Sequence, residues 1–245
     1  VSNTGSTGRG TNVPGDGDFD YIFRIHQSII TDPGRFATLS SQLLSAIVMD
    51  QNSEQRSGRR PEDIRTKHVH VDGLEDEVDV DITFVPRTDK VTYATEDSIK
   101  DYLSNFEGEE RAQVVKNIIA AKKLFKAHEC YKPRHAGGKD EETGKSLAQG
   151  GLGGVGGGNW ILQNGGSLTA AARSFLEAAG VYGQPDAEPV PLEVFVSRYP
   201  IWDLGANHMA EENGRYPHDN FTANNLDADG YKKIIGALRE FLGES

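Results

Sequence analysis

The chain has 245 residues, 36% of them hydrophobic, and a formal net charge of −11. A chain of this length can bury a sizeable core in one or two domains. No stretch approaches the roughly 20 consecutive apolar residues of a membrane span, so we expect no membrane partner. The acidic balance argues against indiscriminate binding to nucleic acid, because such affinity comes largely from Lys and Arg. The one cysteine, Cys130, excludes an internal disulfide and a cysteine-rich zinc site, and it fits a reducing, cytoplasmic environment.

Basic residues are concentrated in two segments of this acidic chain. The first extends from Lys116 to Lys145. The second contains Arg56, Arg59, Arg60, Arg65 and Lys67. Local positive charge attracts anions even where the net charge is negative, so both segments are candidates for contact with an anionic ligand.

Apolar spacing predicts several strands and one helix in the first part of the chain. Residues 20–26 alternate and are rich in aromatic and branched side chains, which is typical of a strand. Residues 34–49 carry apolar side chains at helical spacing, so this helix should pack one face on a sheet. Residues 67–73 and 77–86 are two alternating runs joined by a short polar turn, and they predict neighbouring antiparallel strands.

Helical patterns dominate after Pro86. Four helices are expected, over residues 96–106, 109–128, 168–179 and 230–242. Residues 132–158 are polar and rich in glycine, which predicts a long mobile loop, and residues 191–199 alternate as in a strand. The predicted fold class is therefore α+β, with a mixed-sheet lobe over residues 1–105 followed by a mainly helical lobe over residues 106–245.

Acidic residues occur at alternate positions in two of the predicted strands. Asp18 and Asp20 are two positions apart, so both side chains should point to the same face of the sheet. Asp79 and Asp81 follow the same rule, and either is able to complete a set of three. We favour Asp81, because it lies deepest in the apolar run, where a buried acid requires a partner such as a metal ion. Three such carboxylates suit a pair of Mg²⁺ ions and the chemistry of nucleotidyl transfer.

A glycine-rich segment directly precedes these acids. Gly5, Gly8 and Gly10 allow backbone amides to approach phosphate oxygens closely, and Ser6 is able to donate its hydroxyl. We therefore expect a loop that cradles the phosphates of a nucleotide beside the carboxylates.

Three short motifs, GS at residues 5–6, RGT at 9–11 and DFD at 18–20, together resemble the signature of the nucleotidyltransferase superfamily of polymerase beta. More narrowly, they are similar to the archaeal-type (class I) CCA-adding tRNA nucleotidyltransferases. This resemblance implies that the mixed-sheet lobe is a catalytic palm and that the helical lobe is a neck and body. Residues 151–167 and 200–225 are similar to stretches of that family's body domain, so the resemblance touches most of the chain.

The resemblance also implies roles for individual residues. Residues 122–131 resemble the neck helix of the family, in which a lysine and a tyrosine hold the incoming triphosphate. Lys122 and Tyr131 are therefore expected to contact phosphates, and Lys126 to assist them. The full set expected to bind the nucleotide is Gly5, Ser6, Arg9, Lys122, Lys126 and Tyr131.

By the same resemblance, the reaction moves a nucleoside monophosphate from an NTP to an acceptor hydroxyl and releases pyrophosphate, with two Mg²⁺ ions as cofactors. Asp18 and Asp20 bind both ions, and Asp81 helps one of them to activate the acceptor hydroxyl. A tRNA-like RNA 3′ end ranks first as the acceptor. The alternatives are a synthase of cyclic or linear oligonucleotide messengers and transfer to a small molecule. A non-enzymatic nucleotide-binding module is disfavoured, because an idle cluster of buried acids is costly.

The glycine-rich run over residues 150–158 has further interpretations. It contains a GxGxxG pattern, but no hydrophobic strand precedes it, so we do not expect a dinucleotide-binding fold. On composition alone, the run is equally typical of a linker. Were the loop over 132–158 to close over the nucleotide, these glycines would serve as hinges.

Overall fold

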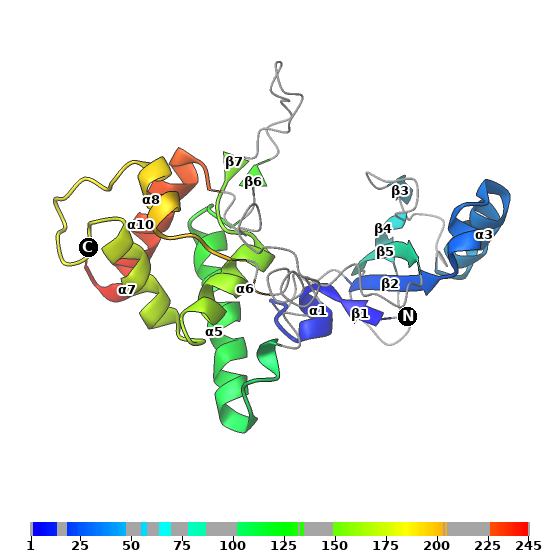
Figure 1. The fold of residues 1–245 in the computed structure, drawn as a ribbon, viewed down its shortest axis with the longest axis horizontal. Coiled ribbons are helices and arrows are strands. Elements are labelled where there is room, and N and C mark those ends of the chain that lie inside the picture. Colours follow the sequence, from blue (N-terminus) through cyan, green and yellow to red (C-terminus); the bar gives the residue numbers. More distant parts are fainter. Residues whose placement is uncertain are drawn as a thin grey trace, which may run out of the picture. The chain divides into compact units, whose positions relative to one another are not determined.

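The structure is a computed structural model of residues 1–245 (Figure 1). It describes residues 2–13, 19–47, 55–57, 64–69, 78–86, 102–131, 133–134, 149–202, 204 and 226–244. At some of these positions, including Asp20 and Asp81, the description covers the backbone only. The chain divides into two compact units, unit 1 (Val1–Glu96) and unit 2 (Asp97–Ser245). The sequence places the division after residue 105.

Unit 1 contains a five-stranded mixed sheet. Its strands are β1 (Ser2–Thr4), β2 (Phe19–Ile25), β3 (Gln55–Ser57), β4 (Ile64–Val69) and β5 (Val78–Pro86). They lie in the order β1-β2-β5-β4-β3, with β2 parallel to β5 and all other neighbours antiparallel. β4 and β5 are the antiparallel neighbours that the sequence predicts, although β4 begins and ends earlier than expected.

One face of this sheet is apolar. Val80, Ile82 and Phe84 of β5 are buried. Side chains at alternate positions of β2 pack against them, and these are Phe19, Tyr21, Phe23 and Ile25. Because successive side chains of a strand point to opposite faces, the residues between these positions lie on the other face of the sheet. This face carries Asp20 and Asp81, and we call it the polar face.

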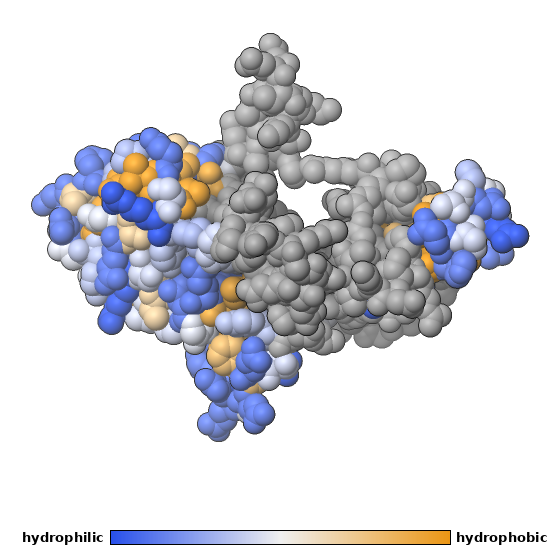
Figure 2. Space-filling view, in the orientation of Figure 1, coloured by the Kyte–Doolittle hydropathy of each residue, from blue (hydrophilic) through white to orange (hydrophobic). Residues whose placement is uncertain are grey.

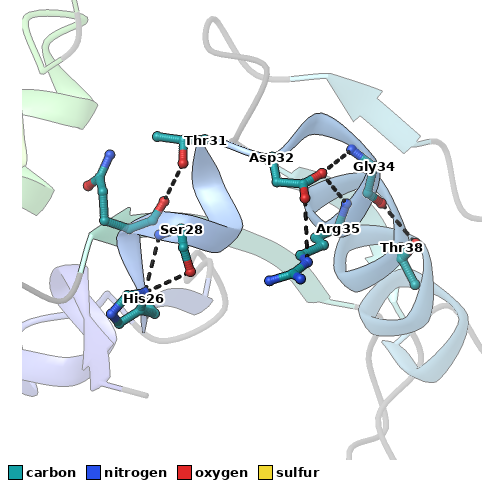
Figure 3. Close-up of polar contacts among 8 residues, drawn as sticks. His26, Ser28, Thr31, Asp32, Gly34, Arg35 and Thr38 are labelled. Atoms are coloured by element: carbon teal, nitrogen blue, oxygen red, sulfur yellow. Dashed lines mark hydrogen bonds and ion pairs between the residues drawn. The ribbon is translucent and has the colours of Figure 1, made fainter.

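Helix α3 (Pro33–Ile47) packs on the apolar face through Phe36 and Leu39, as its spacing predicts. The visible surface of α3 is mostly hydrophilic (Figure 2). Asp32 precedes the helix and accepts hydrogen bonds from the backbone N–H groups of Gly34 (3.0 Å) and Arg35 (3.1 Å), so it caps the first turn (Figure 3). Two shorter helices, α1 (Gly5–Arg9) and α2 (Gln27–Ile30), precede α3 in unit 1.

Unit 2 is mainly helical in its described part. Its helices are α5 (Gly108–Ala127), α6 (Gly154–Gln163), α7 (Leu168–Ala178), α8 (Leu192–Arg198) and α10 (Ala228–Leu242). Two short strands, β6 (Pro133–Arg134) and β7 (Gln149–Gly150), pair antiparallel. Phe175 lies at the centre of an aromatic core, with its ring centroid 4.5 Å from that of Phe195 and 6.2 Å from that of Trp160. The two units together give an α+β fold.

The strand predicted over residues 191–199 is wrong, because this segment forms α8. Its apolar residues alternate, but Leu192, Phe195, Val196 and Tyr199 also follow helical spacing. Phe195 is fully buried in the unit 2 core, and the other three pack against that core. Helical spacing therefore decides the structure of this segment.

The loop predicted over residues 132–158 is wrong at its end, because α6 begins at Gly154. The linker interpretation of residues 150–158 also fails. Gly151 and Leu152 are buried, and a Cβ added at Gly151 would collide with the backbone carbonyl of Cys130. Because glycine has no side chain, the backbone at Gly151 is able to pack closely against that of Cys130. Residues 96–101, 135–148 and 205–225, for which the sequence predicts parts of a helix, a loop and a body segment, lie outside the described residues.

Candidate active site

The register of the sheet brings two of the predicted acids together. Asp20 of β2 lies directly opposite Asp81 of the parallel strand β5. Neighbouring strands are about 4.8 Å apart, and residues in register share a face, so the two aspartates are neighbours on the polar face. Asp79 lies two residues earlier on β5, on the same face but out of register with Asp20. Asp18 lies outside the described residues.

The same register extends across all five strands. Thr4 of β1 is opposite Asp20, and Arg65 of β4 is opposite Asp81. Arg56 of β3 is in turn opposite Arg65. The polar face therefore carries a single row in the order Thr4, Asp20, Asp81, Arg65, Arg56, which we call the charged row. The sequence alone does not predict the charged row, although it places Arg56 and Arg65 in a basic segment.

The glycine-rich segment lies at one end of the charged row. Helix α1 starts at Gly5, directly after Thr4, and packs against β1 and β2. Gly5 and Ser6 therefore lie at the edge of the sheet beside the Asp20 position. The row runs from this helix, through the two acids, to the two arginines.

The prediction of an open loop at residues 5–10 is wrong, because α1 is a turn of helix. The carbonyl of Ser6 accepts hydrogen bonds from the backbone N–H of Thr11 (2.8 Å) and, more weakly, from its hydroxyl (3.4 Å). Gly10 ends the turn with φ +68°, a left-handed conformation that favours glycine. Packing on the sheet and these contacts outweigh the low helix propensity of Gly, Ser and Thr. Arg9, which the sequence assigns to nucleotide binding, is half-buried on α1.

The donor chemistry of the two aspartates fits Mg²⁺, which prefers oxygen ligands and retains water and substrate phosphates in its shell. Among the side chains that the structure describes, no group of three or more His, Cys, Asp or Glu residues could hold a metal ion. The carboxylates of Asp18, Asp20 and Asp81 are not among those side chains. A metal site at this place is therefore supported by the backbone register, in which Asp20 lies opposite Asp81.

Unit 2 brings together the three of its residues that are expected to bind phosphate. Lys122 of α5 is only 2% exposed. A Cβ added at Gly154, the first residue of α6, would lie 2.9 Å from the hydroxyl oxygen of Tyr131 and 3.8 Å from Cε of Lys122. The ammonium group of Lys126 lies 4.9 Å from the centroid of the Tyr131 ring. Lys122, Lys126 and Tyr131 thus gather near the first turn of α6, and Gly154 is a further site residue that sequence reasoning missed.

The first turn of α6 adds positive potential to this group. Backbone N–H groups at a helix N-terminus lack intrahelical partners and carry a partial positive charge. The residue that precedes the helix is Gly153, and the first helical residue is Gly154; both are half-buried, and the Tyr131 hydroxyl lies next to Gly154. A helix N-terminus next to Lys122 has the electrostatic character that favours a phosphate group.

Two buried ionisable groups of unit 2 are poor nucleophiles. Burial raises the pKa of the Cys130 thiol to about 11, an effect that the positive charge of Lys233 partly opposes. Burial also raises the pKa of the Tyr231 hydroxyl to about 12. Both groups therefore stay protonated at neutral pH, which argues against covalent catalysis by Cys130.

Comparison with known protein-family models and with curated proteins found no match for this chain. In the part of the chain that the structure describes, none of the helices has the length and apolar character needed to cross a membrane.

Proposed function

We propose that this protein is a metal-dependent nucleotidyltransferase, with unit 1 as its catalytic palm. The observation that carries the proposal is the register of Asp20 opposite Asp81 on the polar face of the sheet, beside the Gly5-Ser6 dipeptide. Two carboxylates from adjacent strands, next to the glycine-containing turn of α1, are suited to transfer of a nucleoside monophosphate from an NTP to a hydroxyl group. The resemblance of the three short motifs to polymerase beta-like enzymes supports the same reaction.

In this proposal, Asp18, Asp20 and Asp81 hold two Mg²⁺ ions. When bound, Mg²⁺ lowers the pKa of an acceptor hydroxyl and neutralises charge on the triphosphate. Asp81 accepts the hydroxyl proton or holds the hydroxyl for attack. The acceptor oxygen then forms a bond to the α-phosphorus, and the bond to the leaving pyrophosphate breaks.

Within unit 1, the proposal assigns phosphate contacts to Gly5, Ser6 and Arg9. By the resemblance, Lys122, Lys126 and Tyr131 of unit 2 are also expected to contact phosphates. Support comes from the proximity of Lys122 and Tyr131 to Gly154, the first residue of α6. An RNA 3′ end, tRNA-like, remains the first-ranked acceptor through the resemblance, ahead of synthesis of oligonucleotide messengers and transfer to a small molecule.

The test is incorporation of each labelled NTP, with Mg²⁺ and with or without RNA, by the wild type and by Asp20→Asn, Asp79→Asn and Asp81→Asn. Each substitution keeps the size of the side chain and removes one charge. We expect Asp20→Asn and Asp81→Asn to lower the rate by about 10²–10⁴-fold, as for loss of a group that assists proton transfer. Asp79→Asn should retain most of the activity, because Asp79 is out of register with Asp20.

The outcomes separate the parts of the proposal. Extension of RNA favours the first-ranked acceptor, whereas products formed from NTP alone favour a messenger synthase. Loss of activity in Asp79→Asn rather than Asp81→Asn would move the third carboxylate to residue 79. Full activity in both Asp20→Asn and Asp81→Asn, or no incorporation by the wild type, would refute nucleotidyl transfer.

A further inference from the structure

We propose that Gly230 and Lys233 of α10 are positioning residues for the phosphates of the nucleotide. Together they hold the end of α5 against the segment that leads into α6, where Lys122 and Tyr131 are expected to contact phosphates. The inference rests on the proposed function and adds a third helix to it. It comes from close backbone contacts and an ion pair within unit 2.

The first attachment joins α10 to the segment before α6, with no side chain between the two backbones. Gly230 is buried in the first turn of α10. A Cβ added to it would collide with the carbonyl oxygen of Gly150 and would lie 2.6 Å from the carbonyl carbon of that residue. The backbone N–H of Asp227 donates a hydrogen bond to the same carbonyl (3.0 Å). The turn has little freedom to retreat, because the next residue, Tyr231, packs in the aromatic core.

The same segment also packs on the end of α5. A Cβ added to Gly151 would collide with the backbone carbonyl of Cys130. Three residues further along, Gly154 opens α6 and lies next to the hydroxyl of Tyr131, the residue that follows Cys130. A shift of the segment away from Gly230 therefore moves it relative to Cys130 and disturbs the contact between Gly154 and Tyr131.

The second attachment is an ion pair between α10 and the end of α5. Nζ of Lys233 lies 3.6 Å from a carboxylate oxygen of Glu129 and 3.1 Å from one of Asp229. Among the residues that the structure describes, Glu129 is the non-glycine residue with a positive φ, of +55°. Glycine favours this conformation at the end of a helix. A side chain retained in such a backbone conformation points to a function, and here it ties the turn before Tyr131 to α10.

The first test compares Gly230→Ala with Gly236→Ala, a matched control in the same helix whose added Cβ would have none of the described atoms within 4 Å. Isothermal titration calorimetry of the full chain measures binding of Mg²⁺–ATP and of Mg²⁺–tripolyphosphate, which carries no nucleoside. Carbon atoms in contact prefer a separation of about 3.5–4.0 Å, so Gly230→Ala must open its contact with Gly150 by about 1 Å. We expect Gly230→Ala to bind both probes about 10-fold more weakly, as for one hydrogen bond to a charged group, and Gly236→Ala to match the wild type.

The second test breaks the ion pair from each end, with Lys233→Met, Glu129→Gln and the double variant. The two substitutions remove opposite charges, so a purely electrostatic effect on an anionic probe would weaken binding in the first and strengthen it in the second. Positioning predicts that each weakens binding by about 2- to 5-fold, as for a partly exposed ion pair. The double variant should bind no more weakly than Lys233→Met, because both substitutions act on one contact. Lys233→Arg keeps the charge and should retain the wild-type affinity.

Kinetics separate positioning from a loss of folded protein. The weakened variants should raise the KM for the NTP and leave kcat at saturating NTP little changed, because a binding contact is lost equally from the ground state and the transition state. A smaller fraction of folded enzyme would instead lower kcat and leave KM as in the wild type.

Tripolyphosphate affinity in Gly230→Ala equal to that in Gly236→Ala would overturn the inference, and should Gly230→Ala fail to fold, the ion-pair variants decide it. Opposite effects of Lys233→Met and Glu129→Gln, or absence of tripolyphosphate binding by the wild type, would equally overturn it. If the variants lose affinity as expected while the wild type transfers no nucleotide, nucleotidyl transfer fails and the positioning stands. Nucleotide transfer with unaltered binding in every variant defeats the positioning alone.

Discussion

Replacing Gly154 with alanine tests whether the Tyr131 hydroxyl binds the triphosphate. The new Cβ would lie 2.9 Å from that hydroxyl oxygen. Non-bonded carbon and oxygen atoms prefer a separation of about 3.5 Å, so the hydroxyl must move by about 0.5 Å. It lies at the far end of a side chain, so the ring is able to yield without a change of fold. A shift of this size is enough to weaken a hydrogen bond to a phosphate oxygen.

The expected cost is that of one hydrogen bond. A net contribution of about 0.5–1.5 kcal/mol corresponds to a rise in the dissociation constant of about 2- to 12-fold. Isothermal titration calorimetry with each Mg²⁺–NTP measures this change. Thermal denaturation should show no loss of stability, because alanine is a better helix former than glycine by up to about 1 kcal/mol.

Gly157→Ala is the matched control in the same helix. Its Cβ would lie 3.8 Å from Cε2 of Phe125, an ordinary van der Waals contact. It should gain the same helix propensity and leave NTP affinity unchanged. Tyr131→Phe should reproduce the loss seen in Gly154→Ala, and combining the two should cost nothing further, because both act on one contact. NTP affinity in Gly154→Ala equal to that in Gly157→Ala would refute a role for the Tyr131 hydroxyl.

Two further predictions concern stability. The folded-state pKa of Cys130 is raised from 9.0 to about 11, so its contribution is fully present below pH 9 and is lost as pH rises through about 11. The total is about 2–3 kcal/mol. Urea unfolding should therefore show the wild type losing stability faster than Cys130→Ala between pH 8.5 and 10; parallel curves would contradict the burial of this thiol. Asp32→Ala should destabilise α3 by about 1 kcal/mol through loss of its cap, whereas Asp32→Asn should retain most of the stability. Equal midpoints of urea unfolding for the two variants would show that Asp32 does not cap the helix.

The acids of the candidate site could be grouped from the sequence, but the row that contains them could not. Alternation along a strand places Asp20 and Asp81 on the polar faces of their own strands, since Tyr21, Val80 and Ile82 point the other way. That β2 and β5 are adjacent and parallel, with residue 20 opposite residue 81, is a property of register. Register depends on pairing between segments far apart in the chain. For the same reason, the sequence identifies Arg56 and Arg65 only as members of a basic segment.

The errors in unit 2 share a physical cause. Residues 191–199 satisfy both a strand pattern and a helical pattern, and the unit 2 core around Phe195 selects the helix. Residues 150–158 resemble a linker because most of them are glycines. The absence of a side chain nevertheless lets Gly151 pack against the carbonyl of Cys130 and Gly157 approach Phe125. In an isolated peptide the same glycines would disfavour a helix. The proposed phosphate contacts at Lys122 and Tyr131 therefore depend on tertiary packing of a segment whose local preference is the opposite, and substitutions at Gly151 should disturb this site before they disturb the sheet of unit 1.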